Sequence, residues 1–176
     1  MPARFLNTPM EIRTRLAGPE HKAAIWELYQ SALQPHIETI WGWDLAWQHS
    51  YFEGAWSEAA TLVVEADGAL AGYLQLDLRP GAAYLRMLII GQQFRGQRIG
   101  ASLLAAVCAL CEASANPLTL RVFRVNLAAQ RFYQREGWRV VEEEETAYLL
   151  APPTATRPAT AARALCSEDF VLQLAG

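Results

Sequence analysis

The stretch QQFRGQRIG, residues 92–100, constrains the fold more than any other part of the chain. An apolar run at 84–90, YLRMLII, precedes it, and another at 101–111, ASLLAAVCALC, follows it. The first run has the length of a buried strand and the second that of a buried helix. The first turn of a helix presents N–H groups without partners, and the helix dipole favours negative charge there. The stretch therefore predicts an anion site, to which Arg95 and Arg98 add positive charge.

Charge is distributed unevenly along the chain. Between residues 79 and 139 there are nine arginines and two acids, whereas between 20 and 77 there are nine acids and one base, Lys22. This asymmetry is consistent with an anionic ligand in the central segment and a cationic one facing the N-terminal half, and equally with a solvated surface. The arginines lack interleaved aromatic residues and the net charge is −3, so no nucleic-acid partner is expected.

The hydrophobic periodicity predicts one mixed domain of the α/β (α+β) class. A length of 176 residues suits a single domain with a sizeable core. Asp67-Gly68 predicts a hairpin turn, and Pro35 is expected to break or restart a helix. Strands are expected at 11–17, 61–66, 70–78, 84–90, 118–123, 138–144 and 146–151, and helices from Pro19 onward, at 36–52, at 98–113 and at 127–136.

The ends of the chain differ from its middle. Residues 1–10 are interpreted as an N-terminal extension, and 152–176, which begin with Pro, Ala and Thr without periodicity, as a flexible C-terminal tail. The N-terminal residues MPARFLNTPM lack the apolar core of a signal peptide. No apolar run approaches the roughly 20 residues of a membrane helix. A cytoplasmic protein without membrane association is therefore expected.

Neither the cysteines nor the acidic run predicts a metal site. Cys108 and Cys111 form a CxxC pair, which suits redox chemistry or zinc, but they lie inside an apolar helical run and are interpreted as reduced core thiols. The run EEEE at 142–145 is interpreted as a solvated strand edge.

The segment QFRGQR-IGASLL resembles the Q/R-x-x-G-x-G/A loop of the GNAT superfamily of acyl-CoA-dependent N-acyltransferases. Gln93 matches the first position and Gly96 the first glycine, whereas Arg98 stands where the family has Gly or Ala. A helix N-terminal turn accepts right-handed geometry, which suits arginine. Arg98 is therefore expected to be tolerated, with its side chain directed outward.

A second segment, NLAAQRFYQREGW at 126–138, resembles the N-x-x-A-x-x-F-Y-x-x-x-G-F/W segment of the same family. Asn126 is expected to cap a helix and Gly137 to end it in the left-handed conformation. Ala129, Phe132 and Tyr133 then share one helix face. An ordinary amphipathic helix explains this segment alone, but two motifs in the same order favour the family.

The resemblance covers residues 11–151 and implies a GNAT fold, with a mixed, mostly antiparallel sheet of about seven strands that splays between the fourth and fifth strands and is flanked by helices. It implies acetyl-CoA as co-substrate, with the pyrophosphate at the 92–100 loop and the pantetheine arm along strand 84–90. The residues that it implies for coenzyme A are Leu88, Ile89, Ile90, Gln93, Arg95, Gly96, Gln97, Arg98, Ile99, Gly100, Ala101, Asn126 and Tyr133.

The implied chemistry is direct attack of a primary amine on the thioester, with Tyr133 protonating the departing thiolate. A buried tyrosine with a satisfied hydroxyl is the alternative for Tyr133. Many relatives place an acidic base on the fourth strand, but YLRMLII has none. Glu38 is the catalytic candidate for the base, and an amine of low pKa would need none. Other candidates are Asp44, Asp77, His36 and His49.

The aromatic segment 36–52, HIETIWGWDLAWQHSYF, is expected to form the acceptor pocket through His36, Trp41, Trp43 and Asp44. Packing of the tryptophans on the sheet is the competing interpretation. The acceptor is expected to be a small-molecule or peptide amine, and a homodimer is possible. The alternative function is a non-catalytic acyl-CoA-binding sensor or regulatory module.

Overall fold

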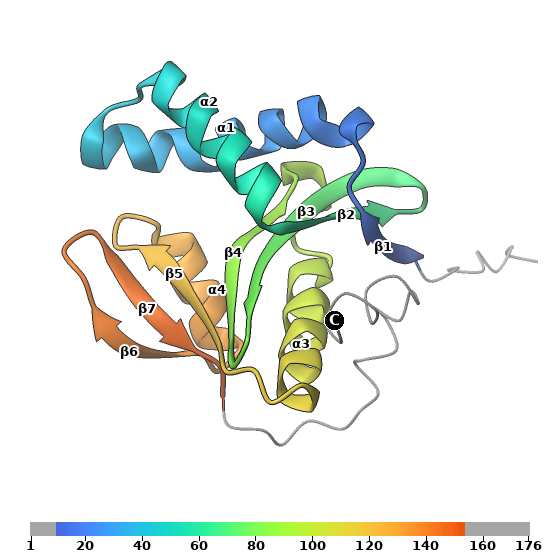
Figure 1. Ribbon diagram of the computed structural model, residues 1–176, viewed down its shortest axis with the longest axis vertical. Helices are drawn as coiled ribbons and strands as arrows, with labels where there is room; N and C mark the ends of the chain where they lie inside the picture. The colour runs from blue at the N-terminus through green and yellow to red at the C-terminus, as the bar shows by residue number, and fades with distance from the viewer. Residues whose placement is uncertain (1–9, 154–176) are drawn as a thin grey trace, which may run out of the picture.

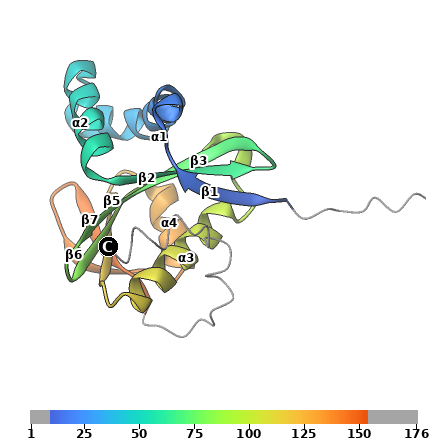
Figure 2. The same ribbon diagram turned by 45° about the vertical axis from the view of Figure 1, so that its right-hand side comes forward.

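The computed structural model describes residues 10–153, which form one seven-stranded sheet with helices on both faces (Figures 1 and 2). Apart from Met10, Pro152 and Pro153, the two predicted extensions lie outside the described residues. The elements in chain order are β1 (Ile12–Leu16), the 3-10 turn η1 (Pro19–His21), α1 (Lys22–Trp41), α2 (Leu45–Glu58), β2 (Ala60–Ala66), β3 (Ala69–Arg79), β4 (Ala82–Ile90), the 3-10 turn η2 (Gln92–Phe94), α3 (Ile99–Ala113), β5 (Leu118–Phe123), α4 (Leu127–Arg135), β6 (Arg139–Glu143) and β7 (Ala147–Ala151).

The strands follow the order β1-β2-β3-β4-β5-β7-β6. Every neighbouring pair is antiparallel except β4 and β5, which are parallel. The parallel pairing covers only Ala83–Leu85 opposite Leu118–Leu120, and the two strands separate beyond it. The predicted α/β (α+β) class and the splay between the fourth and fifth strands are thus confirmed.

Each face of the sheet carries its own apolar core, because successive side chains of a strand point to opposite faces. On β2 and β3, Leu62 and Leu74 pack toward α3, whereas Val63 and Tyr73 pack toward α1 and α2. In Figure 1, α1 and α2 cover one face and α3 and α4 lie on the other. The helices that the sequence predicts to bear the acceptor and the cofactor therefore lie on opposite sides of the sheet.

The expected break at Pro35 is wrong, because α1 runs unbroken through Pro35 as far as Trp41. A proline removes one helical hydrogen bond, but α1 is buried on both sides of it, at Tyr29 and Ile37, and this packing holds the helix. The chain turns instead at Gly42, with φ at 80°. The single predicted segment 36–52 is therefore divided between the end of α1 and the start of α2.

Local turn chemistry agrees with the sequence elsewhere. Asp67 and Gly68 have φ of 48° and 81°, which gives the predicted hairpin between β2 and β3. The side chain of Asn126 caps α4 by accepting from the Ala129 N–H at 3.1 Å, and Gly137 ends the helix with φ at 83°. These three predictions are confirmed.

Cys108 and Cys111 are free thiols in the C-terminal half of α3, the first partly buried and the second buried. Burial raises the pKa of Cys108 to about 12 and that of Cys111 to about 11, so both are protonated and unreactive at neutral pH. Within residues 10–153, no group of three or more His, Cys, Asp and Glu side chains is arranged to hold a metal ion. None of the described helices is long and apolar enough to cross a membrane.

Candidate functional site

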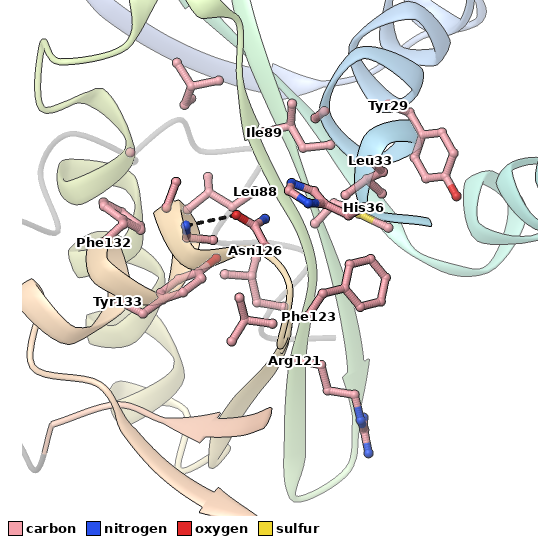
Figure 3. A pocket seen from close by; sticks show the side chains of 18 of the residues that line it. Tyr29, Leu33, His36, Leu88, Ile89, Arg121, Phe123, Asn126, Phe132 and Tyr133 are labelled. Carbon is pink, nitrogen blue, oxygen red and sulfur yellow. Dashed lines mark hydrogen bonds between the residues drawn. The ribbon is translucent and has the colours of Figure 1, made fainter. Parts of the chain in front are cut away.

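The separation of β4 and β5 opens a cavity of about 1200 Å³ between the two layers of helices. Its walls come from α1 and α2 on one side, from α4 and the start of α3 on the other, and from the diverging strands between them. Figure 3 shows side chains from both layers directed into this space. The cavity thus joins the predicted cofactor loop to the predicted acceptor segment.

One edge of β4 offers free backbone groups to the cavity. The Gly91 N–H donates to the Ala71 oxygen at 2.8 Å. Hydrogen bonds between antiparallel strands alternate along each strand. The backbone N–H and C=O of Ile89 therefore also point toward β3, whereas those of Leu88 and Ile90 point into the gap. The Ile90 oxygen accepts from Arg95 Nε at 2.9 Å. The remaining groups suit an extended ligand that pairs with β4 like an added strand.

The 92–100 loop lies where β4 passes into α3, and Phe94, Arg95, Gly96, Arg98 and the residues 99–101 line the cavity. Gln93 and Gln97 are exposed and do not line it; Gln97 Nε2 donates to the Gln93 oxygen at 3.2 Å. The first intrahelical bond of α3 runs from the Ser102 N–H to the Arg98 oxygen, so the preceding N–H groups of the helix are left for a ligand.

The expectation that Arg98 adopts right-handed geometry is wrong. Arg98 is the N-cap residue of α3 with φ at 62° and ψ at 12°, in the left-handed region. Gly96 also has positive φ, at 76°. Glycine adopts this left-handed conformation without strain, whereas arginine adopts it at a cost in free energy. The side chain of Arg98 is exposed, as predicted.

We expect Arg98→Gly to raise the free energy of unfolding by about 0.5–1 kcal/mol, because glycine adopts the left-handed conformation without strain. Gln97→Gly is the matched control, since Gln97 lies next to it without positive φ, and this variant should lower the same quantity. Urea denaturation of the three proteins measures both effects. If Arg98→Gly is less stable than wild type, the conclusion that the left-handed backbone of Arg98 is strained is wrong.

Tyr133 lies on α4 at the inner wall of the cavity, packed on Phe132 and Trp138 at ring distances of 5.1 and 5.8 Å. Figure 3 shows its hydroxyl directed toward Asn126 and the gap. Burial raises the pKa of Tyr133, so that the hydroxyl keeps its proton at neutral pH. A protonated hydroxyl in this position can serve as an acid and not as a base.

Gln130 fixes the corner between β5 and α4, and the sequence reasoning missed it. Its side-chain amide donates to the carbonyl oxygens of Phe123 and Arg124 at 3.0 and 2.7 Å. These bonds anchor the start of α4 and thereby the placement of Asn126 and Tyr133. A glutamine inside an amphipathic helix carries no sequence signal for this role.

The structure divides the four predicted acceptor residues. His36 and Trp41 line the cavity, and the Trp41 ring meets Phe123 edge-on at 5.7 Å, so that α1 contacts β5 across the opening. Trp43, between α1 and α2, is partly buried and packs against the core, with its ring 6.3 Å from that of Tyr29. Asp44 caps α2 by accepting from the Trp47 N–H at 3.0 Å. Both latter residues have structural roles here.

Glu38, the candidate base, lies outside the cavity. It is exposed on α1, where its carboxylate accepts from Gln34 Nε2 at 2.7 Å. His49 is also exposed, on α2. Asp77 is held by Arg86, whose guanidinium lies 2.9 Å away. The structure therefore brings none of these three to the cavity as a free base.

The charged groups at the acceptor end of the cavity are paired arginines. None of the nine acids between 20 and 77 lines the cavity, whereas Arg86 on β4 and Arg121 on β5 do. Arg121 pairs with Glu144 at 2.8 Å and lies over the Tyr84 ring at 5.6 Å. The acceptor end is thus aromatic with its arginines paired, and none of the acids between 20 and 77 lines it.

Residues 22–138 match the model of the family described as the acetyltransferase (GNAT) family. A candidate ribosomal protein bS18-alanine N-acetyltransferase of Bacillus subtilis (strain 168) is 36% identical over 77 residues, which are 43% of this chain and 51% of that protein. The chain thus spans about half the length of the curated relative that it matches.

Solved structures share the fold. The PaiA N-acetyltransferase of Thermoplasma acidophilum, in complex with coenzyme A, superposes with a TM-score of 0.65 at 18% identity, over 80% of this chain and 98% of that one. Arabidopsis thaliana Naa50, in complex with the bisubstrate analogue CoA-Ac-MVNAL, gives 0.58 at 17% identity, over 81% and 99%. At such identities the likeness extends to the fold alone.

Proposed function

Because the chain belongs to the GNAT acetyltransferase family, we propose that it is an N-acetyltransferase that moves an acetyl or similar small acyl group from acyl-CoA to a primary amine by direct attack. The observation that carries this proposal is the cavity between β4 and β5, which runs from the N-terminus of α3 past the free edge of β4 to Tyr133. A fold without this opening would leave no path from the loop to the acceptor side.

The residues present fit coenzyme A, which supplies the acyl group as an activated thioester. The free N–H groups of residues 99–101 and the cation of Arg95 suit the pyrophosphate. The groups of Leu88 and Ile90 that face the gap suit the amide-bearing pantetheine arm. The Leu88 N–H also suits the thioester oxygen, whose negative charge grows as the amine attacks.

Tyr133 is assigned as the acid that protonates the leaving sulfur. It comes from the opposite wall to α1 and α2, so the amine and the acid approach the thioester from different sides. Its raised pKa keeps the proton available until the C–S bond breaks. Asn126 and Gln130 hold the start of α4 and so position this hydroxyl.

The acceptor end of the cavity suits an amine on an apolar or aromatic body better than a polycation. Tyr84, Trp41 and Phe123 supply aromatic surface, while Arg86 and Arg121 are both paired with carboxylates. Glu144, the carboxylate that lines this end, is already bound by Arg121, so it is not free to bind a second ammonium group of a polyamine. Peptide α-amines with apolar side chains and small arylalkyl amines are therefore the proposed acceptors.

Thiol release from acetyl-CoA tests the proposal, with spermidine, kanamycin, phenethylamine, L-phenylalanine and the tripeptide Ala-Tyr-Phe as acceptors. We expect amine-dependent release, with phenethylamine or the tripeptide at least about tenfold faster than spermidine. Isothermal calorimetry with coenzyme A runs beside it. Absence of coenzyme A binding would contradict the whole assignment of the cavity.

A non-catalytic acyl-CoA sensor is the second candidate. One observation favours it: the residue of β4 at the acceptor end is Arg86, held by Asp77, and no carboxylate of that strand faces the cavity. Tight coenzyme A binding without thiol release for any of the five amines would support this candidate over the transferase.

A further inference from the structure

The side chain of His36 supplies an imidazole to the wall of the cavity. Of the three histidines in the chain, His36 lines this space, whereas His21 and His49 do not. Figure 3 shows the ring projecting from α1 into the gap opposite Asn126 and Tyr133. It is half-buried, and within residues 10–153 it makes no hydrogen bond or ion pair. Both ring nitrogens are therefore free for a ligand.

The reaction needs a base on this side of the cavity. An acceptor amine is mostly protonated at neutral pH and must lose a proton before it attacks. Among the described residues, two carboxylates line the cavity, and neither suits this task. Glu144 is bound by Arg121, and Glu136 lies at the end of α4, the helix that bears the acid Tyr133.

Burial favours the neutral form of the imidazole. Burial lowers the pKa of His36 from its usual value. The charged groups that line the same cavity at the acceptor end are Arg86 from β4, which is paired with Asp77, and Arg121 from β5, which is paired with Glu144. The titratable groups around them are Tyr29 on α1, Tyr51 on α2, Tyr84 on β4, Tyr133 on α4 and the paired Glu144 before β7.

We propose that His36 is the general base that removes the proton from the acceptor amine, in place of the acid that β4 lacks. The proposal rests on the transferase function proposed above. It assigns to α1 the proton-accepting role and to α4 the proton-donating role, so that the two groups face the thioester from opposite walls. Glu38, two residues along α1, points away and cannot share this role.

The protons and electrons balance in this scheme. A neutral ring nitrogen of His36 takes one proton from the ammonium form of the acceptor, and the freed lone pair forms the N–C bond to the thioester carbon. The C–S bond breaks with its electron pair on sulfur, which takes the Tyr133 proton. The nitrogen, which still carries one proton too many for an amide, loses that proton to water; Tyr133 regains a proton from water, and His36 releases its proton to water.

The test compares wild type with His36→Gln, using the fastest acceptor of the five amines and saturating acetyl-CoA. We expect kcat at pH 7 to fall by about 100-fold in His36→Gln. The wild-type kcat should decline only below about pH 6.5, as the base protonates. In His36→Gln this decline should be absent, and kcat should instead rise steadily with pH as the free amine forms without help.

Two further variants separate a base from a structural side chain. His36→Ala should regain activity with added imidazole, whereas Tyr133→Phe should not. His49→Gln is the matched control on the exposed face of α2 and should keep the wild-type rate. Coenzyme A affinity, measured by calorimetry, should be unchanged in His36→Gln, which shows that the variant is folded.

The outcomes distinguish this proposal from the one beneath it. If wild type turns over an amine, and His36→Gln does so at the same rate and with the same decline of kcat at low pH, His36 is not the base. The proposed transferase function would then still stand. If the wild-type kcat does not decline at low pH, the assignment of His36 as the base is also wrong, and this result does not depend on whether His36→Gln folds. A wild type that turns over no amine would overturn both.

Discussion

In the Tyr133→Phe variant we expect kcat to fall by about 10²- to 10⁴-fold, the range for loss of a positioned general acid. The variant removes a single oxygen at the cavity wall and keeps the ring, which still packs on Phe132 and Trp138. The thiolate must then leave without a proton. The affinity for coenzyme A and the KM for the amine should change little, because the hydroxyl acts mainly as the C–S bond breaks.

Tyr148→Phe is the matched control for this result. Tyr148 lies on β7 beneath Arg124, at 4.5 Å from the guanidinium carbon, and does not line the cavity. Thiol release under saturating acetyl-CoA measures kcat for both variants and for wild type. Equal kcat in Tyr133→Phe and wild type would remove Tyr133 from the chemistry and leave it as a packing residue.

Among Gly→Ala changes in the described residues, Gly72→Ala should be the most destabilising. A β-carbon on Gly72 would overlap the backbone oxygen of Ile89 and lie 3.1 Å from its carbonyl carbon. These are backbone atoms of the neighbouring strand, so the β3–β4 ladder must shift as a whole. We expect the free energy of unfolding to fall by about 3 kcal/mol, and coenzyme A binding to weaken, because the shift moves Leu88 and Ile90.

Gly54→Ala supplies the control, since it adds the same methyl group elsewhere. Gly54 lies inside α2, where a β-carbon would meet no atom within 4 Å. This variant should raise the free energy of unfolding by about 0.5–1 kcal/mol, because alanine has the higher helix propensity. Urea denaturation measures both variants. Equal stability of Gly72→Ala and wild type would contradict the close approach of the two strands.

Local patterns predicted most of the fold. The alternation of apolar residues, the Asp67-Gly68 turn and the caps at Asn126 and Gly137 depend on neighbours in the sequence, and all appear in the structure. Pro35 did not end α1, because burial of Tyr29 and Ile37 outweighs the loss of one helical hydrogen bond. Tertiary packing of this kind is not encoded in any short stretch of sequence.

Site residues that belong to a sequence motif could be predicted, whereas those whose position depends on the three-dimensional arrangement could not. The motif led to the 92–100 loop and to Tyr133, but it could not show that Arg98 stands at a left-handed position. Trp43 and Asp44 share the aromatic segment with Trp41 and yet face the core and a helix end. The directions of the Trp43 and Asp44 side chains depend on where α1 ends. The structure has this end at Gly42, whereas the sequence predicted a break at Pro35.

The sheet is two half-sheets that meet along a seam of three residue pairs, Ala83–Leu85 with Leu118–Leu120. A molecule bound along the edge of β4 and against α4 would contact both half-sheets at once. It would therefore hold the two half-sheets together in addition to the three residue pairs. At 100 times its dissociation constant, such a ligand adds about 2.7 kcal/mol to the stability. The resistance of the two half-sheets to opening would therefore depend on whether such a ligand is bound.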